Sequence, residues 1–123
     1  MAIRRFILNV TTAADGSYTG YTPYISGKIY AIHYIKTNFT DGVDFTITAE
    51  ATGETIWTEA NVNAAAVKAP RQATHSTAGV AALYAAGGVA VNSLIALSRD
   101  RIKVVLASGG NATTGQFQFL IED

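Results

Sequence analysis

The segment from residue 28 to residue 36 constrains the fold most, because it is apolar on both of its alternate rows. Successive side chains of a β-strand point to opposite faces of a sheet. Treated as one regular strand, the segment carries one row of Ile29, Ala31 and Ile35 and a second row of Tyr30, Ile32 and Tyr34. The domain's own core covers one face, so we expect another chain to cover the second.

Composition limits the partners and the chemistry that we expect. A length of 123 residues fits a single domain with its own hydrophobic core. The formal net charge is zero, so neither nucleic acid nor a membrane is an expected partner. The absence of cysteine excludes disulfides, thiolate catalysis and sulfur-ligated metals. Charged residues make up 15% of the chain against roughly 25% in ordinary domains, which favours burial of its surface against other subunits.

Alternation with period two recurs along the chain, with turn residues between the runs, and predicts an all-β fold. The predicted strands cover residues 3–11, 28–38, 43–50, 54–58, 93–98, 102–107 and 115–121. No helix separates them regularly, which favours an antiparallel β-sandwich of the jelly-roll type over residues 1–123. Residues 1–26 contain glycine and proline, and we expect part of this segment to be an arm or an edge strand.

The strand rhythm stops between residues 60 and 92, where the chain is rich in alanine. One interpretation is a short helix that Thr77 caps and the pair Gly87 and Gly88 ends. The other is an irregular loop. Loops of this length are uncommon in compact domains unless they serve a purpose, so the insertion is expected to carry an interaction surface.

No motif for catalysis or metal binding is present in the sequence. His33 and His75 are the only imidazoles, and their spacing matches no zinc motif. Asp44 and Glu50 lie at outward positions of a predicted strand, without the desolvation that a glycosidase acid requires. We therefore expect no enzymatic activity and no cofactor.

Tyrosine and arginine are the residue types that most often anchor protein interfaces. The predicted interface residues are Arg4, Arg5, Tyr18, Tyr21, Tyr24, Tyr30, Tyr34, Arg71 and Tyr84. Arg99, Arg101 and Lys103 form the densest basic patch, but Asp100 lies between the arginines, which disfavours a platform for single-stranded nucleic acid. Stacking of the tyrosine rings on sugars stays open as an alternative.

A series of short motifs runs through the chain from residue 27 onward. They are GKIY at 27–30, TDGVDFTI at 40–47, TG at 52–53, IW at 56–57, APR at 69–71, RIKVV at 101–105, GG at 109–110 and TG at 114–115. In this order the sequence resembles the small head proteins of tailed bacteriophages that decorate or cement a capsid. The resemblance implies a β-sandwich subunit, a dimer or trimer, seated on the capsid exterior after synthesis in the host cytoplasm. It implies no active site.

The leading expectation is thus a non-enzymatic virion structural protein that bridges subunits of the major capsid protein. Flat β surfaces and an extended arm would supply the contact area. The alternative is a carbohydrate-binding or receptor-binding module of a phage tail or fibre, in which the tyrosines contact the ligand.

Overall fold

The computed structural model describes residues 2–123, which form an all-β fold. Its strands are β1 (Ile3–Thr11), β2 (Tyr18–Tyr21), β3 (Ile25–Lys36), β4 (Val43–Ala49), β5 (Thr55–Val62), β6 (Ala66–Lys68), β7 (Arg71–Ala73), β8 (Asn92–Asp100), β9 (Ile102–Ala107) and β10 (Thr114–Glu122). The helix considered after Thr77 is wrong, because residues 77–85 form turns and short extended pieces. Within residues 2–123 no helix is long and apolar enough to cross a membrane.

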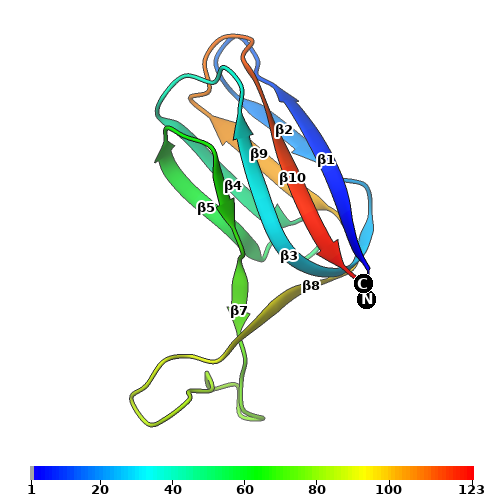
Figure 1. Cartoon of the computed structure of the whole chain (residues 1–123), viewed down its shortest axis with the longest axis vertical. Helices are drawn as coiled ribbons and strands as arrows, with labels where there is room; N and C mark the ends of the chain where they lie inside the picture. Colours follow the sequence, from blue (N-terminus) through cyan, green and yellow to red (C-terminus); the bar gives the residue numbers. More distant parts are fainter. Residues whose placement is uncertain (1) are drawn as a thin grey trace.

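Two antiparallel sheets pack against each other, as the sequence predicts (Figure 1). One sheet has the order β1-β10-β3-β8-β7, with β6 beside β3, and the other has the order β2-β9-β4-β5. The pairs β1–β10, β2–β9, β3–β8 and β4–β5 are nested within one another along the chain. The sandwich is therefore one long hairpin folded over on itself. The first two strands, β1 and β2, lie at sheet edges.

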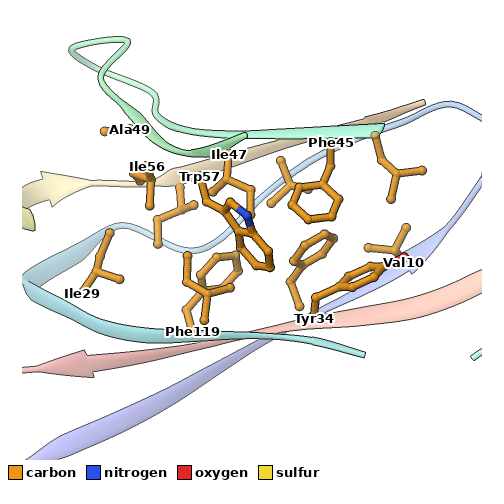
Figure 2. Close-up of a cluster of buried hydrophobic side chains, with 14 of the residues drawn as sticks. Val10, Ile29, Tyr34, Phe45, Ile47, Ala49, Ile56, Trp57 and Phe119 are labelled. Atoms are coloured by element: carbon orange, nitrogen blue, oxygen red, sulfur yellow. The ribbon is translucent and has the colours of Figure 1, made fainter. Parts of the chain in front are cut away.

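Aromatic rings fill the space between the sheets (Figure 2). The inward row of β4, which includes Phe45, is buried and its outward row is not, as the alternation predicts. The Phe45 ring lies 4.7 Å from the Trp57 ring and 5.3 Å from the Phe117 ring, both edge to face. The Tyr34 ring is 5.1 Å from that of Phe45 and 5.2 Å from that of Phe117. These rings join strands of both sheets.

The expectation of two apolar rows on β3 is wrong, because the strand contains a β-bulge. Leu120 of β10 pairs with Ala31, but the next residue of β10, Ile121, pairs with Ile29. Tyr30 is therefore an extra residue between the two pairs. An extra residue reverses which side chains face the core from that point on.

The bulge changes the assignment of the β3 side chains. Ile29 faces the core before the bulge, and Ile32 and Tyr34 face it afterwards, each of them at most 1% exposed. Ile32 and Tyr34 therefore lie in the core and not on a second apolar row, and the predicted interface role of Tyr34 is wrong. Tyr30 stays 43% exposed.

Tyr34 provides a test of the core packing. Its hydroxyl is buried without a hydrogen-bond partner, and burial raises the pKa of Tyr34 to about 12. Tyr34→Phe removes this hydroxyl and keeps the ring contacts, so the free energy of unfolding is expected to rise by about 1–3 kcal/mol in urea denaturation. Tyr84→Phe, whose side chain is exposed, is the matched control and should change nothing. Destabilisation by Tyr34→Phe would show that the hydroxyl has a partner.

Candidate functional site

An arm formed by residues 71–94 projects from the sandwich (Figure 1). Its base is a ribbon in which β7 pairs with the beginning of β8. Beyond the ribbon, residues 74–91 form the arm tip. There the Thr74 nitrogen donates to the Val91 oxygen (2.9 Å), the Val91 nitrogen to the Ala82 oxygen (3.0 Å) and the Ala82 nitrogen to the Thr74 oxygen (2.9 Å). Backbone hydrogen bonds thus join the residues around Thr74, Ala82 and Val91 to one another.

The arm has no core of its own. In the described chain no residue between Val62 and Ile95 is buried. Four large apolar side chains of the arm tip are exposed, namely Val80, Leu83, Tyr84 and Val89.

Beyond Arg71 at its base the arm is also uncharged, since no Asp, Glu, Lys or Arg occurs between Arg71 and Arg99. Ordering a backbone costs about 1–2 kcal/mol per residue, and an arm that buries none of its own side chains recovers little of that cost. An ordered, apolar and uncharged projection is typical of a segment that packs on another molecule.

A tyrosine–arginine cluster of Tyr21, Tyr24 and Arg101 lies where the β8–β9 turn meets the end of β2 and the segment after it. Arg101 forms a bidentate ion pair with Glu50, with distances of 2.7 Å from Nε to Oε1 and 2.9 Å from Nη2 to Oε2. Its guanidinium carbon is 4.1 Å from the centroid of the Tyr21 ring and 5.4 Å from that of Tyr24. The hydrogen bond from Arg101, aided by its charge, holds the pKa of Glu50 below the ordinary value of 4.5. Tyr24 is 64% exposed beside this pair.

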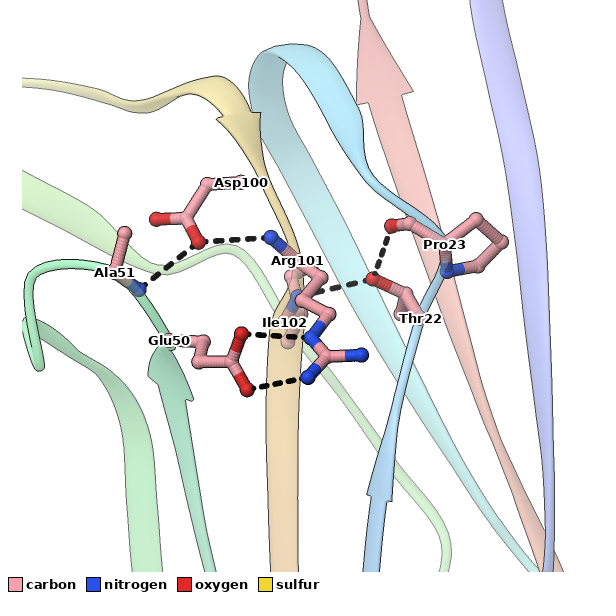
Figure 3. Close-up of polar contacts among 7 residues, drawn as sticks. All are labelled: Thr22, Pro23, Glu50, Ala51, Asp100, Arg101 and Ile102. Carbon is pink, nitrogen blue, oxygen red and sulfur yellow. Dashed lines mark hydrogen bonds and ion pairs between the residues drawn. The ribbon is translucent and has the colours of Figure 1, made fainter.

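Backbone hydrogen bonds fix the position of Arg101 (Figure 3). The buried Asp100 carboxylate accepts from the backbone nitrogens of Ala51 (3.0 Å) and Arg101 (2.8 Å). On the other side, the Thr22 hydroxyl accepts from the Ile102 nitrogen at 2.9 Å. The cluster is therefore preorganised, which lowers the ordering cost of any contact that it makes.

A third exposed surface is the outer face of the six-stranded sheet. The strand registers place Ile7, Gln118, His33 and Val67 in one row across β1, β10, β3 and β6. Ile7 is 53% exposed and Val67 is 61% exposed.

The amide side chains of this outer face bond to one another. Gln118 donates to Gln116 at 2.8 Å, and Gln116 donates to Asn9 at 2.9 Å. The amides in this region thus already have partners, and the exposed Arg5 lies on the same side of β1 as Ile7.

The predicted interface residues fall into several places. Those exposed at the surface are Arg4, Arg5, Tyr21, Tyr24, Tyr30, Arg71 and Tyr84. Tyr21 and Tyr24 come together at Arg101, and Tyr84 is on the arm tip. The Arg71 guanidinium lies 5.9 Å from the centroid of the Tyr30 ring and donates to the backbone carbonyl oxygen of Tyr30 at 3.1 Å.

Two more of the predicted interface residues, Arg4 and Tyr18, also have partners within the chain. Arg4 forms an ion pair with Asp123 at 3.0 Å, and the half-buried Tyr18 donates its hydroxyl to the Asn9 oxygen at 3.4 Å. Sequence reasoning did not predict the ion pair of Glu50 with Arg101 or the row from Ile7 to Val67 on the outer face. The charge-free stretch between residues 71 and 99 is a signal in the sequence that points to the arm.

No protein-family model matches the chain, and no curated protein matches its sequence. Across residues 2–123, the side chains form no group of three acidic or imidazole residues suited to a metal ion and line no pocket. The three exposed surfaces are therefore the candidate functional regions of the described chain.

The Glu50–Arg101 pair predicts a pH dependence of stability. Because the folded-state pKa of Glu50 is lowered, the pair stabilises the fold above pH 4.5, and this contribution is lost as the pH falls through the folded-state pKa. Glu50→Gln should be less stable than wild type at neutral pH, and the difference should shrink in acid when urea denaturation is repeated there. Glu54→Gln, outside the ion pairs of residues 2–123, is the control. A difference that stays constant with pH would contradict the assignment.

Proposed function

We propose that this protein is a non-enzymatic structural subunit of a bacteriophage virion, which decorates the capsid exterior and bridges subunits of the major capsid protein. The arm carries the proposal. It is ordered by backbone hydrogen bonds, exposes apolar side chains and contains no charge between residues 71 and 99. Such a segment gains stability when a neighbouring subunit covers it.

Two further observations support an assembly role. The nested strand pairs of the β-sandwich support assigning it as a jelly roll, an architecture of viral capsid and lectin domains. This is an analogy of fold, and it agrees with the resemblance of the sequence motifs to phage head proteins. The tyrosine–arginine cluster gives each subunit a second exposed surface, separate from the arm. A subunit with two such surfaces is suited to joining two neighbours.

The binding strength comes from area and from copy number. Covering apolar surface contributes roughly 25 cal/mol per Å² before the ordering costs of association are subtracted. The uncharged arm adds no cost for removing charges from water. On a symmetric shell many copies act together, which multiplies the effect of a modest single contact.

The alternative is a sugar-binding module of a phage tail or fibre. The exposed rings of Tyr21 and Tyr24 favour it, since sugars stack on tyrosine rings. Arg101 lies 4.1 Å over the Tyr21 ring, however, and occupies one of the two ring faces. Specific binding on a glycan array that is lost in Tyr21→Ala would support this alternative against the capsid proposal.

A shortened arm tests the proposed function. In the test variant an Asn-Gly turn replaces residues 74–91 and joins Ala73 to Asn92, which pair across β7 and β8. None of the replaced residues is buried, so the free energy of unfolding should stay within about 0.5 kcal/mol of wild type. Wild type should co-sediment with capsid shells assembled without it, and the variant should bind at least about tenfold more weakly.

Two results would contradict the proposed function. One is absence of wild-type binding to the shells, and the other is equal binding by the shortened variant. Urea denaturation of the same preparation of the variant serves as the control for its fold.

A further inference from the structure

We infer that the open edge of β1 is a docking site for one extended segment of another protein, which adds to the six-stranded sheet as a further antiparallel strand and places a carboxylate opposite Arg5. This site lies apart from the arm and from the tyrosine–arginine cluster, so it goes beyond the proposed function.

Strand β1 is the one long and regular strand among those that end the two sheets of residues 2–123 (Figure 1). It has nine residues without glycine or proline, and its pairing with β10 has no register shift. The other edge strands are β7 with three residues, β2 with four, and β5, whose pairing with β4 shifts register twice. Short or irregular edges resist the addition of a strand, and a long regular edge accepts one.

The even-numbered residues of β1 direct their backbone groups toward β10. Just outside the two ends of the strand, the Ala2 oxygen accepts from the Asp123 nitrogen at 3.1 Å, and the Thr12 nitrogen donates to the Thr113 oxygen at 2.9 Å. Consecutive residues of a strand alternate in the side to which their backbone groups point. The odd-numbered residues of β1 therefore direct theirs toward the open edge.

Ile3, Arg5 and Ile7 form the unpaired part of this edge. The Asn9 oxygen points the same way, but the Tyr18 hydroxyl already donates to it at 3.4 Å. Within residues 2–123, no backbone group outside β10 bonds to Ile3, Arg5 or Ile7. Each of the three offers an N–H and a carbonyl oxygen at the spacing that a second extended chain matches.

The side chains of the same three residues define the chemistry of the added strand. They lie on one side of β1, with Ile3 52% exposed, Ile7 53% exposed and the exposed Arg5 between them. Arg4 has an ion pair with Asp123, whereas Arg5 has none in the described chain. Opposite charges facing each other across an antiparallel pair stabilise it. The segment that fits therefore has a carboxylate with an apolar residue two positions to each side.

A second copy of β1 fits this edge poorly. When both copies use Ile3, Arg5 and Ile7, the antiparallel register places Arg5 opposite Arg5, and like charges in this position destabilise the pair. A register centred on Phe6 or Ile7 instead brings the second copy against Asn9, whose oxygen already has a partner. The charge thus favours an acidic segment of a different protein.

Titration of the isotope-labelled full chain with a short peptide tests the site by NMR. The probe is the peptide Thr-Val-Thr-Glu-Thr-Val-Thr with blocked ends, in which each valine is two positions from the glutamate. The amide signals of Ile3, Arg5 and Ile7 should shift at millimolar peptide, and these amides should gain protection from hydrogen exchange. The signal of the buried Ile47 should not move.

Methylation of the peptide backbone separates strand addition from contact through side chains alone. N-methyl groups on the two valines and the glutamate remove the N–H groups that face β1, and should weaken binding at least about tenfold. N-methyl groups on the two threonines beside the glutamate point away from β1, and should leave the affinity nearly unchanged.

Charge exchange tests the contact with Arg5. Wild type should bind the glutamate peptide more tightly than a peptide with lysine in its place, and Arg5→Glu should reverse this preference. Lys68→Glu makes the same change of charge at an exposed residue of β6 and should keep the wild-type preference. An unchanged Ile47 signal in each variant checks that the core is intact.

Four results would overturn the inference. They are no shift at the three amides, equal binding of the two methylated peptides, equal binding of the glutamate and lysine peptides, and shifts that grow with protein concentration in the absence of peptide. The last would identify a second copy of β1 as the occupant. Binding to capsid shells through the arm is measured separately, so failure of either experiment leaves the other conclusion standing.

Discussion

The aromatic contact between the two sheets is the interaction on which the rest of the structure depends. Phe45 from one sheet packs against Tyr34 and Phe117 from the other, and Trp57 closes the group. The buried side chains all belong to this sandwich and its turns, and none lies in the described residues between Val62 and Ile95. The arm is held at its base by strand pairing and gains nothing from the core.

This division places the proposed assembly surface outside the part of the chain that forms the core. Strand β4 alternates between buried residues and residues that are exposed or partly exposed, as expected of a strand with one covered face. The arm lacks this alternation because neither of its faces is covered within the chain. Its composition, apolar and uncharged, is that of an interface core. Under the proposed function, a neighbouring subunit covers the apolar side chains of the arm that folding leaves exposed.

The sequence predicted the fold class and most of the strands, since alternation is a local property of each segment. Three features of the fold could not be predicted from local alternation. The bulge at Tyr30 depends on the pairing of β3 with β10, and no periodicity in β3 alone distinguishes a bulged strand with one apolar face from a regular strand with two. The strand β5 reaches Val62 instead of ending at residue 58, continuing its pairing with β4. The path of the arm follows from backbone hydrogen bonds between segments far apart in an alanine-rich sequence.

The sequence predicted some residues of the candidate surfaces but not the contacts that bring them together. Residue type singled out Tyr21, Tyr24 and Arg71, because tyrosine and arginine anchor interfaces wherever they are exposed. The ion pair of Arg101 with Glu50 joins residues that are 51 positions apart, and only the fold brings them together. The row through Ile7 required the registers of neighbouring strands.

Amide hydrogen exchange at the arm tip tests most directly the claim that the arm is stabilised by assembly. Backbone hydrogen bonds without buried side chains around them open easily, so the amides of Ala82 and Val91 should exchange almost freely in the unbound protein. Protection at these two amides should rise when the protein binds capsid shells, while the buried Ile47 of β4 stays protected throughout. Equal and strong protection of the tip in unbound and bound protein would contradict the account.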